Sequence, residues 1–180
     1  MTIISPEKAE AYLQKLCVEI PSRRVGSPGN RAATDFFAQR VASFGFRVEC
    51  PTFDCIDWKC DGVRLSANGA AFDALASPYS LGCRVTAPLV VVSTIQDLES
   101  AELFGKVVLL RGEIAKEQLM PKNFSFYNPD EHKRIVALLE TKKPRAIIAA
   151  TTHNPDLVGA MYPFPLIEDG DFDIPSVFMT

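Results

Sequence analysis

The sequence predicts a mixed α/β (α+β) protein: an N-terminal helical lead-in and strand, followed by a module of mixed β-strands with one or two flanking helices. Three short apolar runs rich in β-branched residues, at 89–92, 106–110 and 146–150, are typical of buried strands. A helical pattern ending at Lys143-Pro144 separates the second run from the third. The order strand, strand, loop, helix, strand predicts a compact module.

The N-terminal part begins with two predicted helices. Ser5-Pro6-Glu7 is a helix start, because Ser5 can cap, Pro6 needs no N–H bond there and Glu7 meets the positive end of the helix dipole. Pro21 ends this helix, and residues 21–29 form a loop rich in Pro and Gly. Asn30 is the expected cap of the second helix, Gly45 ends it, and residues 46–49 are predicted to form a strand.

Each of these helices carries apolar residues at helical spacing, and we expect both stripes to face a core. The stripes are Ala9, Tyr12, Leu13, Leu16 and Ile20 in the first helix, and Ala33, Phe37, Val41 and Phe44 in the second, with Phe36 alongside.

The second part of the chain contains several turn and helix signals. Asn68-Gly69 predicts a β-hairpin, and Pro88 opens the strand at 89–92. Residues 97–104 predict a short helix, and residues 174–179 a last strand. We expect a domain boundary between Cys50 and Cys60, which divides the chain into domains 1–55 and 56–180.

Composition excludes some classes of function. The chain has 180 residues, 47% of them hydrophobic, and a net charge of −3. This charge argues against a general nucleic-acid binder, which needs a basic surface. No signal-peptide pattern and no apolar run of about 18 residues is visible. We therefore expect no nucleic-acid partner, no membrane span and a cytoplasmic location.

The candidate catalytic and metal-binding residues do not form a known motif. His132 and His153 are the only histidines, and we expect both at the surface rather than on zinc. Cys50, Cys55 and Cys60 are not spaced as C-x-x-C, so buried or semi-buried free thiols are expected. The acidic run 168–173 lacks the spacing of a calcium loop. No catalytic and no metal-binding residue is assigned.

Three stretches nevertheless resemble a known family. RRVGSPGNRAATDFFAQRVASFGFRVE, at 23–49, resembles the N-terminal lead of zinc aminopeptidases of the aminopeptidase Y and glutamate carboxypeptidase kind. APLVVVS, FGKVVLLRG and RAIIAAT resemble the protease-associated (PA) domain inserted in such peptidases. DFDIPSVFMT resembles the segment where that insert ends.

This resemblance implies a non-catalytic role for the residues present. In that family the zinc ligands and the general-base Glu follow the point that corresponds to Thr180, so no cofactor is expected in this chain and zinc is expected in the missing catalytic part. The expected function is to shape substrate access or to mediate a protein interaction. The implied partners are a peptide substrate or the missing peptidase domain, and exposed faces of the first two helices predict self-association.

The resemblance also implies which residues meet substrate. The long connection 112–128 is the expected substrate-proximal loop. Lys122 and Asn123 can hydrogen-bond a peptide, and Phe124 and Tyr127 can supply apolar contact. The alternative, that Phe124 and Phe126 anchor the loop on the core, stays open at this point. Arg23 and Arg24 are candidates for contact with substrate or with the missing domain, although solvated loop arginines are common.

Two other hypotheses remain. The chain could be a self-contained peptide- or protein-binding module that is not part of an enzyme. It could also be a small thiol-dependent enzyme, in which case one of its five cysteines would react much faster than an ordinary thiol.

Overall fold

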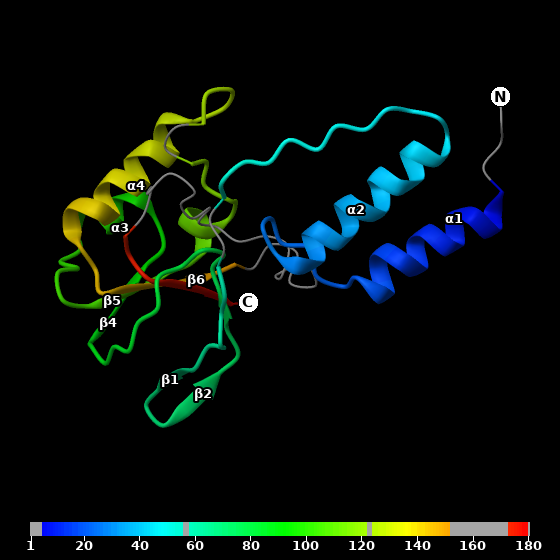
Figure 1. Ribbon diagram of the computed structural model, residues 1–180. Coiled ribbons are helices and arrows are strands. Elements are labelled where there is room, and N and C mark those ends of the chain that lie inside the picture. The colour runs from blue at the N-terminus through cyan, green and yellow to red at the C-terminus, as the bar shows by residue number, and fades with distance from the viewer. Residues whose placement is uncertain (1–4, 56–57, 122–123, 152–172, 180) are drawn as a thin grey trace. The chain divides into compact units, whose positions relative to one another are not determined.

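The computed structural model describes residues 5–55, 58–121, 124–151 and 173–179 (Figure 1). The chain forms two compact units, Met1–Asp57 and Trp58–Thr180. The described residues confirm the mixed α/β fold class, with helices in the first unit and strands with flanking helices in the second. The identity of the two units as a peptidase lead-in and a PA-like module stays a prediction.

The first unit contains α1 (Pro6–Leu13), a π-helical continuation η1 (Gln14–Glu19) and α2 (Pro28–Ser43). Ser5 caps α1 as expected, with its hydroxyl accepting from the Lys8 N–H at 3.4 Å. The cap of α2 is Ser27 rather than Asn30, because the Ser27 hydroxyl accepts from the Asn30 N–H at 3.1 Å. Pro28 then takes the first helical position, where its missing N–H costs nothing.

The first turn of α2 packs closely against the backbone of the loop that precedes it. A Cβ atom at Gly29 would lie 1.9 Å from the carbonyl oxygen of Ser22, so a side chain at this position would have to displace backbone. At the other end of the helix, Gly45 has a φ of 88° and donates its N–H to Ala42 at 2.9 Å. The prediction that Gly45 ends this helix is confirmed.

Among the described residues of the first unit, the expected core is largely missing, and Ile20 is the one predicted stripe residue that is buried, at 7% exposed. Tyr12 and Phe36 meet edge to face at 5.8 Å between ring centroids, and the Arg40 guanidinium lies 5.1 Å from the Phe36 ring centroid. Leu13 and Phe37, which we expected in a core, are 64% and 68% exposed. The apolar stripes therefore meet only partly, and Phe36 takes the inward position predicted for Phe37.

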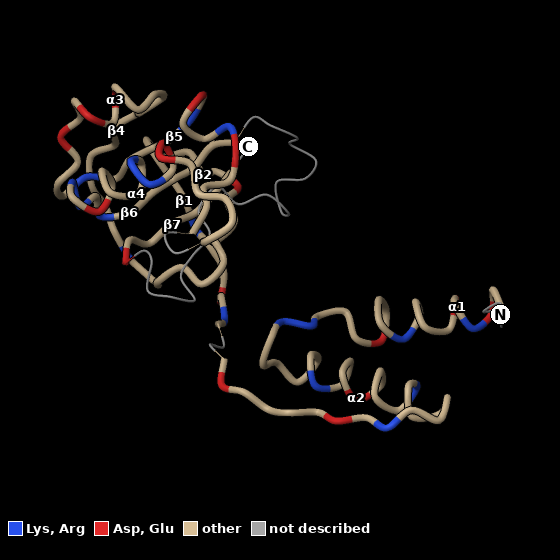
Figure 2. The backbone as a smooth tube through the Cα atoms, turned by 90° about the horizontal axis from the view of Figure 1, so that it is seen from above, with Lys and Arg blue, Asp and Glu red and all other residues tan. Residues whose placement is uncertain are grey.

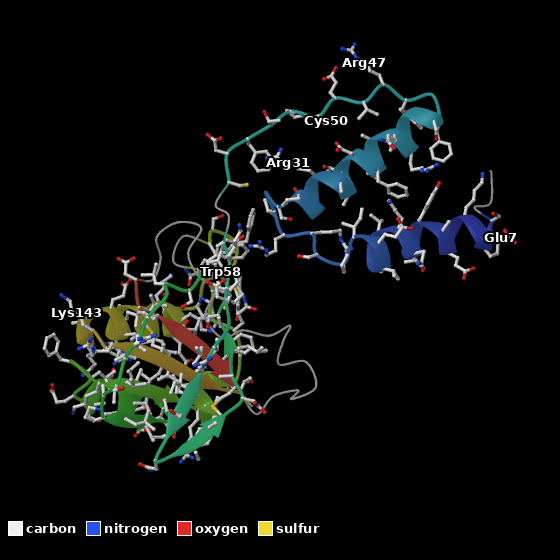
Figure 3. The ribbon with its side chains drawn as sticks, turned by 60° about the horizontal axis from the view of Figure 1, so that its bottom comes forward. Glu7, Arg31, Arg47, Cys50, Trp58 and Lys143 are labelled. Atoms are coloured by element: carbon white, nitrogen blue, oxygen red, sulfur yellow. The ribbon has the colours of Figure 1, made fainter. Side chains whose placement is uncertain are left out.

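The prediction of a strand at 46–49 is wrong. These residues form no strand in the described chain, and Arg47 pairs with Glu49 at 2.9 Å instead. The Arg47 side chain points away from α2 (Figure 3). A strand requires a partner for its backbone N–H and C=O groups, and a local apolar pattern does not supply one.

The second unit is built on a five-stranded sheet with the order β3-β7-β6-β5-β4. Its strands are β3 (Leu75–Ala76), β4 (Leu89–Val92), β5 (Val107–Leu110), β6 (Ala146–Ala150) and β7 (Ser176–Met179). The strands β4 to β7 are parallel, and β3 runs antiparallel to β7. The three predicted apolar strands and the C-terminal strand are confirmed.

Alternate residues of the sheet face two apolar layers, as the period of a strand requires. On one side, α3 (Ile95–Ser100) and α4 (Asp130–Lys142) cover the sheet (Figure 1), and Val108, Ile147 and Phe178 join the larger buried cluster there. On the other side, Val107 and Ile148 form a smaller cluster.

A hairpin contributes to the second face of the sheet. It consists of β1 (Leu65–Ala67) and β2 (Ala70–Phe72), and Leu65 packs against the smaller cluster. Asn68 and Gly69 connect the strands with φ values of 51° and 81°. Both positive φ values are those of a two-residue hairpin turn, so the prediction from Asn68-Gly69 is confirmed.

The two helices of this unit have well-formed ends. Thr94 and Asp97 form a capping box, so α3 begins at Ile95 rather than at Asp97 as predicted. At the C-terminal end of α4, Lys143 adopts a left-handed conformation, with φ 49° and ψ 59°, and donates its N–H to Leu139 at 2.9 Å. Figure 3 shows Lys143 at this position.

Candidate functional site

The loop between β5 and α4 is anchored to the core by aliphatic side chains. It opens with the 3-10 helix η2 (Gly112–Ala115), in which Ile114 and Ala115 are buried. Leu119, further along, is 2% exposed. The Ile114 N–H also donates to the Ser93 carbonyl at 3.1 Å, which ties the loop to the end of β4. The first half of the loop is thus part of the folded unit.

His132 holds the middle of this loop from the first turn of α4. Its side chain is 4% exposed, and its Nδ1 accepts a hydrogen bond from the Met120 N–H at 3.1 Å. A neutral imidazole that accepts at Nδ1 carries its proton at Nε2, which lies 3.4 Å from Glu117 Oε1. The prediction of a surface His132 is therefore wrong: tertiary packing places this ring under the loop.

The second half of the loop presents aromatic rings. Phe124 and Phe126 meet edge to face at 6.0 Å between ring centroids, and Tyr127 lies 6.5 Å from the His132 ring. The exposed fractions are 92% for Phe126, 60% for Tyr127 and 43% for Phe124. Phe126 consequently does not anchor the loop on the core. We name Phe124, Phe126 and Tyr127 the aromatic loop patch.

Two of the predicted loop contacts, Lys122 and Asn123, lie outside the described residues. The neighbouring Asn128 donates its Nδ2 hydrogen to the Pro121 carbonyl at 3.1 Å, which brings the two sides of that segment together. The sequence does not assign Phe126 to the site. Its position among other aromatic residues in a long connection indicates a contact residue, but a sequence pattern cannot distinguish a ring that anchors a loop from a ring that is exposed.

Charged residues at the start of the loop pair with each other. Lys116 Nζ lies 3.2 Å from Glu113 Oε2, and both side chains are largely exposed. The hydrogen bond and the charge of Glu113 raise the pKa of Lys116 above its usual value. Because the pair is solvated, it adds little to stability and leaves both signs of charge available beside the loop.

Arg23 and Arg24 lie in the first unit and are exposed. The Arg23 guanidinium donates to the Ile20 carbonyl at 2.9 Å, so it closes the end of the π-helical segment. This local bond gives Arg23 a structural role. Contact of either arginine with a substrate or another domain stays a prediction.

No cluster of three or more metal-ligating side chains occurs within the described ranges. His153 and residues 168–172 lie outside them, and Asp173 is exposed. The five cysteines are free and exposed, so the expectation of buried or semi-buried thiols is wrong. Within the described part of the chain, no helix has the length and apolar character needed to cross a bilayer.

The second unit is thus a mixed α/β structure with a mostly parallel sheet, and one of its loops exposes aromatic side chains. Over 121 residues the chain is 29% identical to the probable lipoprotein aminopeptidase LpqL of Mycobacterium tuberculosis (strain H37Rv). This match covers 59% of the chain but only 24% of the relative, so the chain spans about a quarter of that protein's length. No family model and no solved structure matches. The similarity relates part of the chain to a protein named as an aminopeptidase.

Proposed function

We propose that this chain is the non-catalytic N-terminal and PA-like portion of a zinc-dependent aminopeptidase, and that its second unit shapes access of peptides to chemistry carried out elsewhere. The observation that supports this proposal most directly is the partial similarity to a protein named as an aminopeptidase. The zinc, the catalytic residues and the PA assignment belong to the proposal.

The aromatic loop patch is the proposed contact with peptide. Phe126 and Tyr127 expose ring surface that can cover apolar side chains of a peptide, and aromatic residues are frequent in such contacts. His132 and the buried aliphatic residues of the loop hold the backbone from below, which lowers the entropy lost on binding. Lys116 and Glu113 add opposite charges near the loop's start.

The first experiment measures peptide binding by fluorescence anisotropy with labelled apolar peptides. Phe126→Ser should weaken binding about fivefold or more, since truncating an exposed aromatic contact costs about 1 kcal/mol or more. Phe104→Ser is the matched control, because Phe104 is 78% exposed in the same unit but outside the loop. Equal effects of the two substitutions would contradict a role for the loop.

A second experiment addresses the division between accessory and catalytic parts. The 180-residue chain with added zinc should not hydrolyse aminoacyl p-nitroanilides, and turnover at the rate of an ordinary aminopeptidase would refute the non-catalytic role. If the reading frame extends past Thr180, the longer polypeptide should hydrolyse these substrates. In that polypeptide, Phe126→Ser should raise KM for peptides more than it lowers kcat.

One observation favours a self-contained binding module as the second candidate. The sheet of the second unit has apolar clusters on both faces, including the fully buried Leu110 and Ile147. Such a unit can fold and bind without a catalytic partner. Peptide binding that depends on Phe126, together with a longer reading frame that lacks peptidase activity, would support this candidate over the first.

A further inference from the structure

The strand β4 forms one end of the five-stranded sheet and pairs only with β5 within the described residues. The Pro88 and Val92 carbonyls accept from the Val107 and Arg111 N–H groups, at 2.9 and 3.0 Å. Both N–H and C=O of a residue in a parallel strand point to the same side, and successive residues alternate. The backbone N–H and C=O groups of Leu89 and Val91 therefore point away from the sheet.

The free part of this edge is short and ends at Ser93. Pro88 points its carbonyl towards β5, so it adds no outward group before Leu89. The next outward residue after Val91 is Ser93, whose N–H donates to Asp97 Oδ2 at 3.0 Å and whose carbonyl accepts from Ile114. In the described chain no hydrogen bond reaches the outward groups of Leu89 or Val91. Two donors and two acceptors are left in strand geometry.

The side chains at this edge lack the usual protection. Natural edge strands are blunted by charges, prolines or bulges that prevent pairing with another chain. The sequence of β4 is Leu-Val-Val-Val, without a charged residue (Figure 2). Leu89 and Val91 are 48% and 47% exposed, on the face opposite to the one that carries Val92. The edge is thus open both in its backbone and in its side chains.

We propose that β4 is a docking site for an extended peptide, which adds to the sheet as a further strand. Only an extended backbone can satisfy donors and acceptors spaced along a strand edge. Leu89 and Val91 would then lie beside alternate side chains of the peptide, which favours apolar and β-branched residues at every second position. This inference does not depend on the proposed peptidase-related function.

A peptide fits this edge better than a second copy of the chain. Stable dimers bury about 1,200–2,000 Å² in total, and transient ligands bind with less. The edge offers four residues, of which Leu89 and Val91 carry the outward groups, and η2 and the α3 cap close it at Ser93. An edge of this length suits a short ligand that binds reversibly.

The test uses a fluorescein-labelled octapeptide in which valine alternates with threonine between lysine ends. We expect saturable binding to the full chain, and binding about tenfold weaker for the same peptide with N-methylated backbone, which cannot form a ladder. In hydrogen exchange, the amides of Leu89 and Val91 should become slower on saturation. Exchange at these two amides would not change if the peptide bound at the loop.

The variant pair is Val91→Pro and Val91→Thr. Proline removes the outward N–H of Val91 without touching a bond of the β4–β5 ladder, so the fold is retained and the affinity should fall about tenfold. Threonine keeps the N–H and the branched shape, and should stay within about threefold. Circular dichroism checks the fold, and the N-methylated peptide decides the question if Val91→Pro does not fold.

Three results would overturn the proposal. One is no binding of the octapeptide at a concentration of about 1 mM, which corresponds to the weakest affinity that the assay can detect. Another is binding that neither Val91→Pro nor backbone N-methylation weakens. The last is sedimentation of a dimer that Val91→Pro dissociates, since the edge would then be occupied by a second copy. Loss of loop binding in Phe126→Ser, with binding at β4 intact, would separate this site from the aromatic loop patch.

Discussion

Replacing His132 tests whether this buried ring holds the loop between β5 and α4. His132→Ala removes the acceptor of the Met120 N–H and leaves a void at a position that is 4% exposed. An unsatisfied, partly buried N–H costs about 1–2 kcal/mol, and a void of this size about 2 kcal/mol more. The free energy of unfolding should therefore fall by about 3–4 kcal/mol.

His132→Asn is the matched variant, because an Asn side-chain oxygen can reach the place of Nδ1 and accept from Met120. It should cost only about 1–2 kcal/mol, from the smaller void that remains. Urea titration gives both free energies, and hydrogen exchange reports the Met120 amide directly. This amide should exchange faster in His132→Ala and stay protected in His132→Asn. A loss below about 1 kcal/mol in His132→Ala, or equal losses in the two variants, would refute the reasoning.

Three further predictions concern single backbone and cap positions. Lys143→Gly should stabilise the protein by about 1 kcal/mol and raise Tm by about 3–5 °C, because Lys143 has a φ of 49° and glycine adopts this left-handed conformation without strain. Lys143→Ala should not stabilise the protein, and a thermal unfolding experiment that ranks the two variants otherwise would contradict this reasoning. Hydrogen bonds from the Ser93 backbone and the Thr94 side chain lower the pKa of Asp97 in the folded state, so its contribution to stability is present above the unfolded pKa and is lost as pH falls below about 4. The stability difference between the wild type and Asp97→Ala, measured in urea, should accordingly shrink from pH 7 to pH 3, and a constant difference would argue against the cap. Gly29→Ala should destabilise the first unit by about 2 kcal/mol or more, since its Cβ would meet the Ser22 carbonyl, and an unchanged helical signal on heating would disprove that contact.

Local chemistry could be predicted well from the residues. Asn68-Gly69 specifies a turn with two positive φ values, and Pro6 with Ser5 specifies a helix start, whatever surrounds them. The apolar runs of β4, β5 and β6 are long enough, and β-branched enough, to be recognised as buried strands. The helix α3 was predicted less closely: it begins at Ile95, two residues before the predicted start at Asp97, because Thr94 caps it.

The candidate site was harder to predict. The loop 112–128 was recognised from its length, but the side chains that hold it were not. His132 has no sequence partner that marks it as buried, and its acceptor role depends on Met120 lying across the first turn of α4. Phe126 is exposed, whereas Ile114, Ala115 and Leu119 of the same loop pack in the core against other segments. These are relations between segments, which a local pattern does not contain.

By itself the sequence determined the class of fold, the hairpin and most helix and strand positions, because these follow from turn chemistry, caps and the period of apolar residues. Tertiary structure decided the rest. Residues 46–49 have a strand pattern but no partner backbone, and so form no strand among the described residues. Strand order alone makes β4 an edge and β6 an interior strand, although both are similar apolar runs. Hydrogen-bond partners and burial are properties of neighbours in space, and only the folded chain supplies those neighbours.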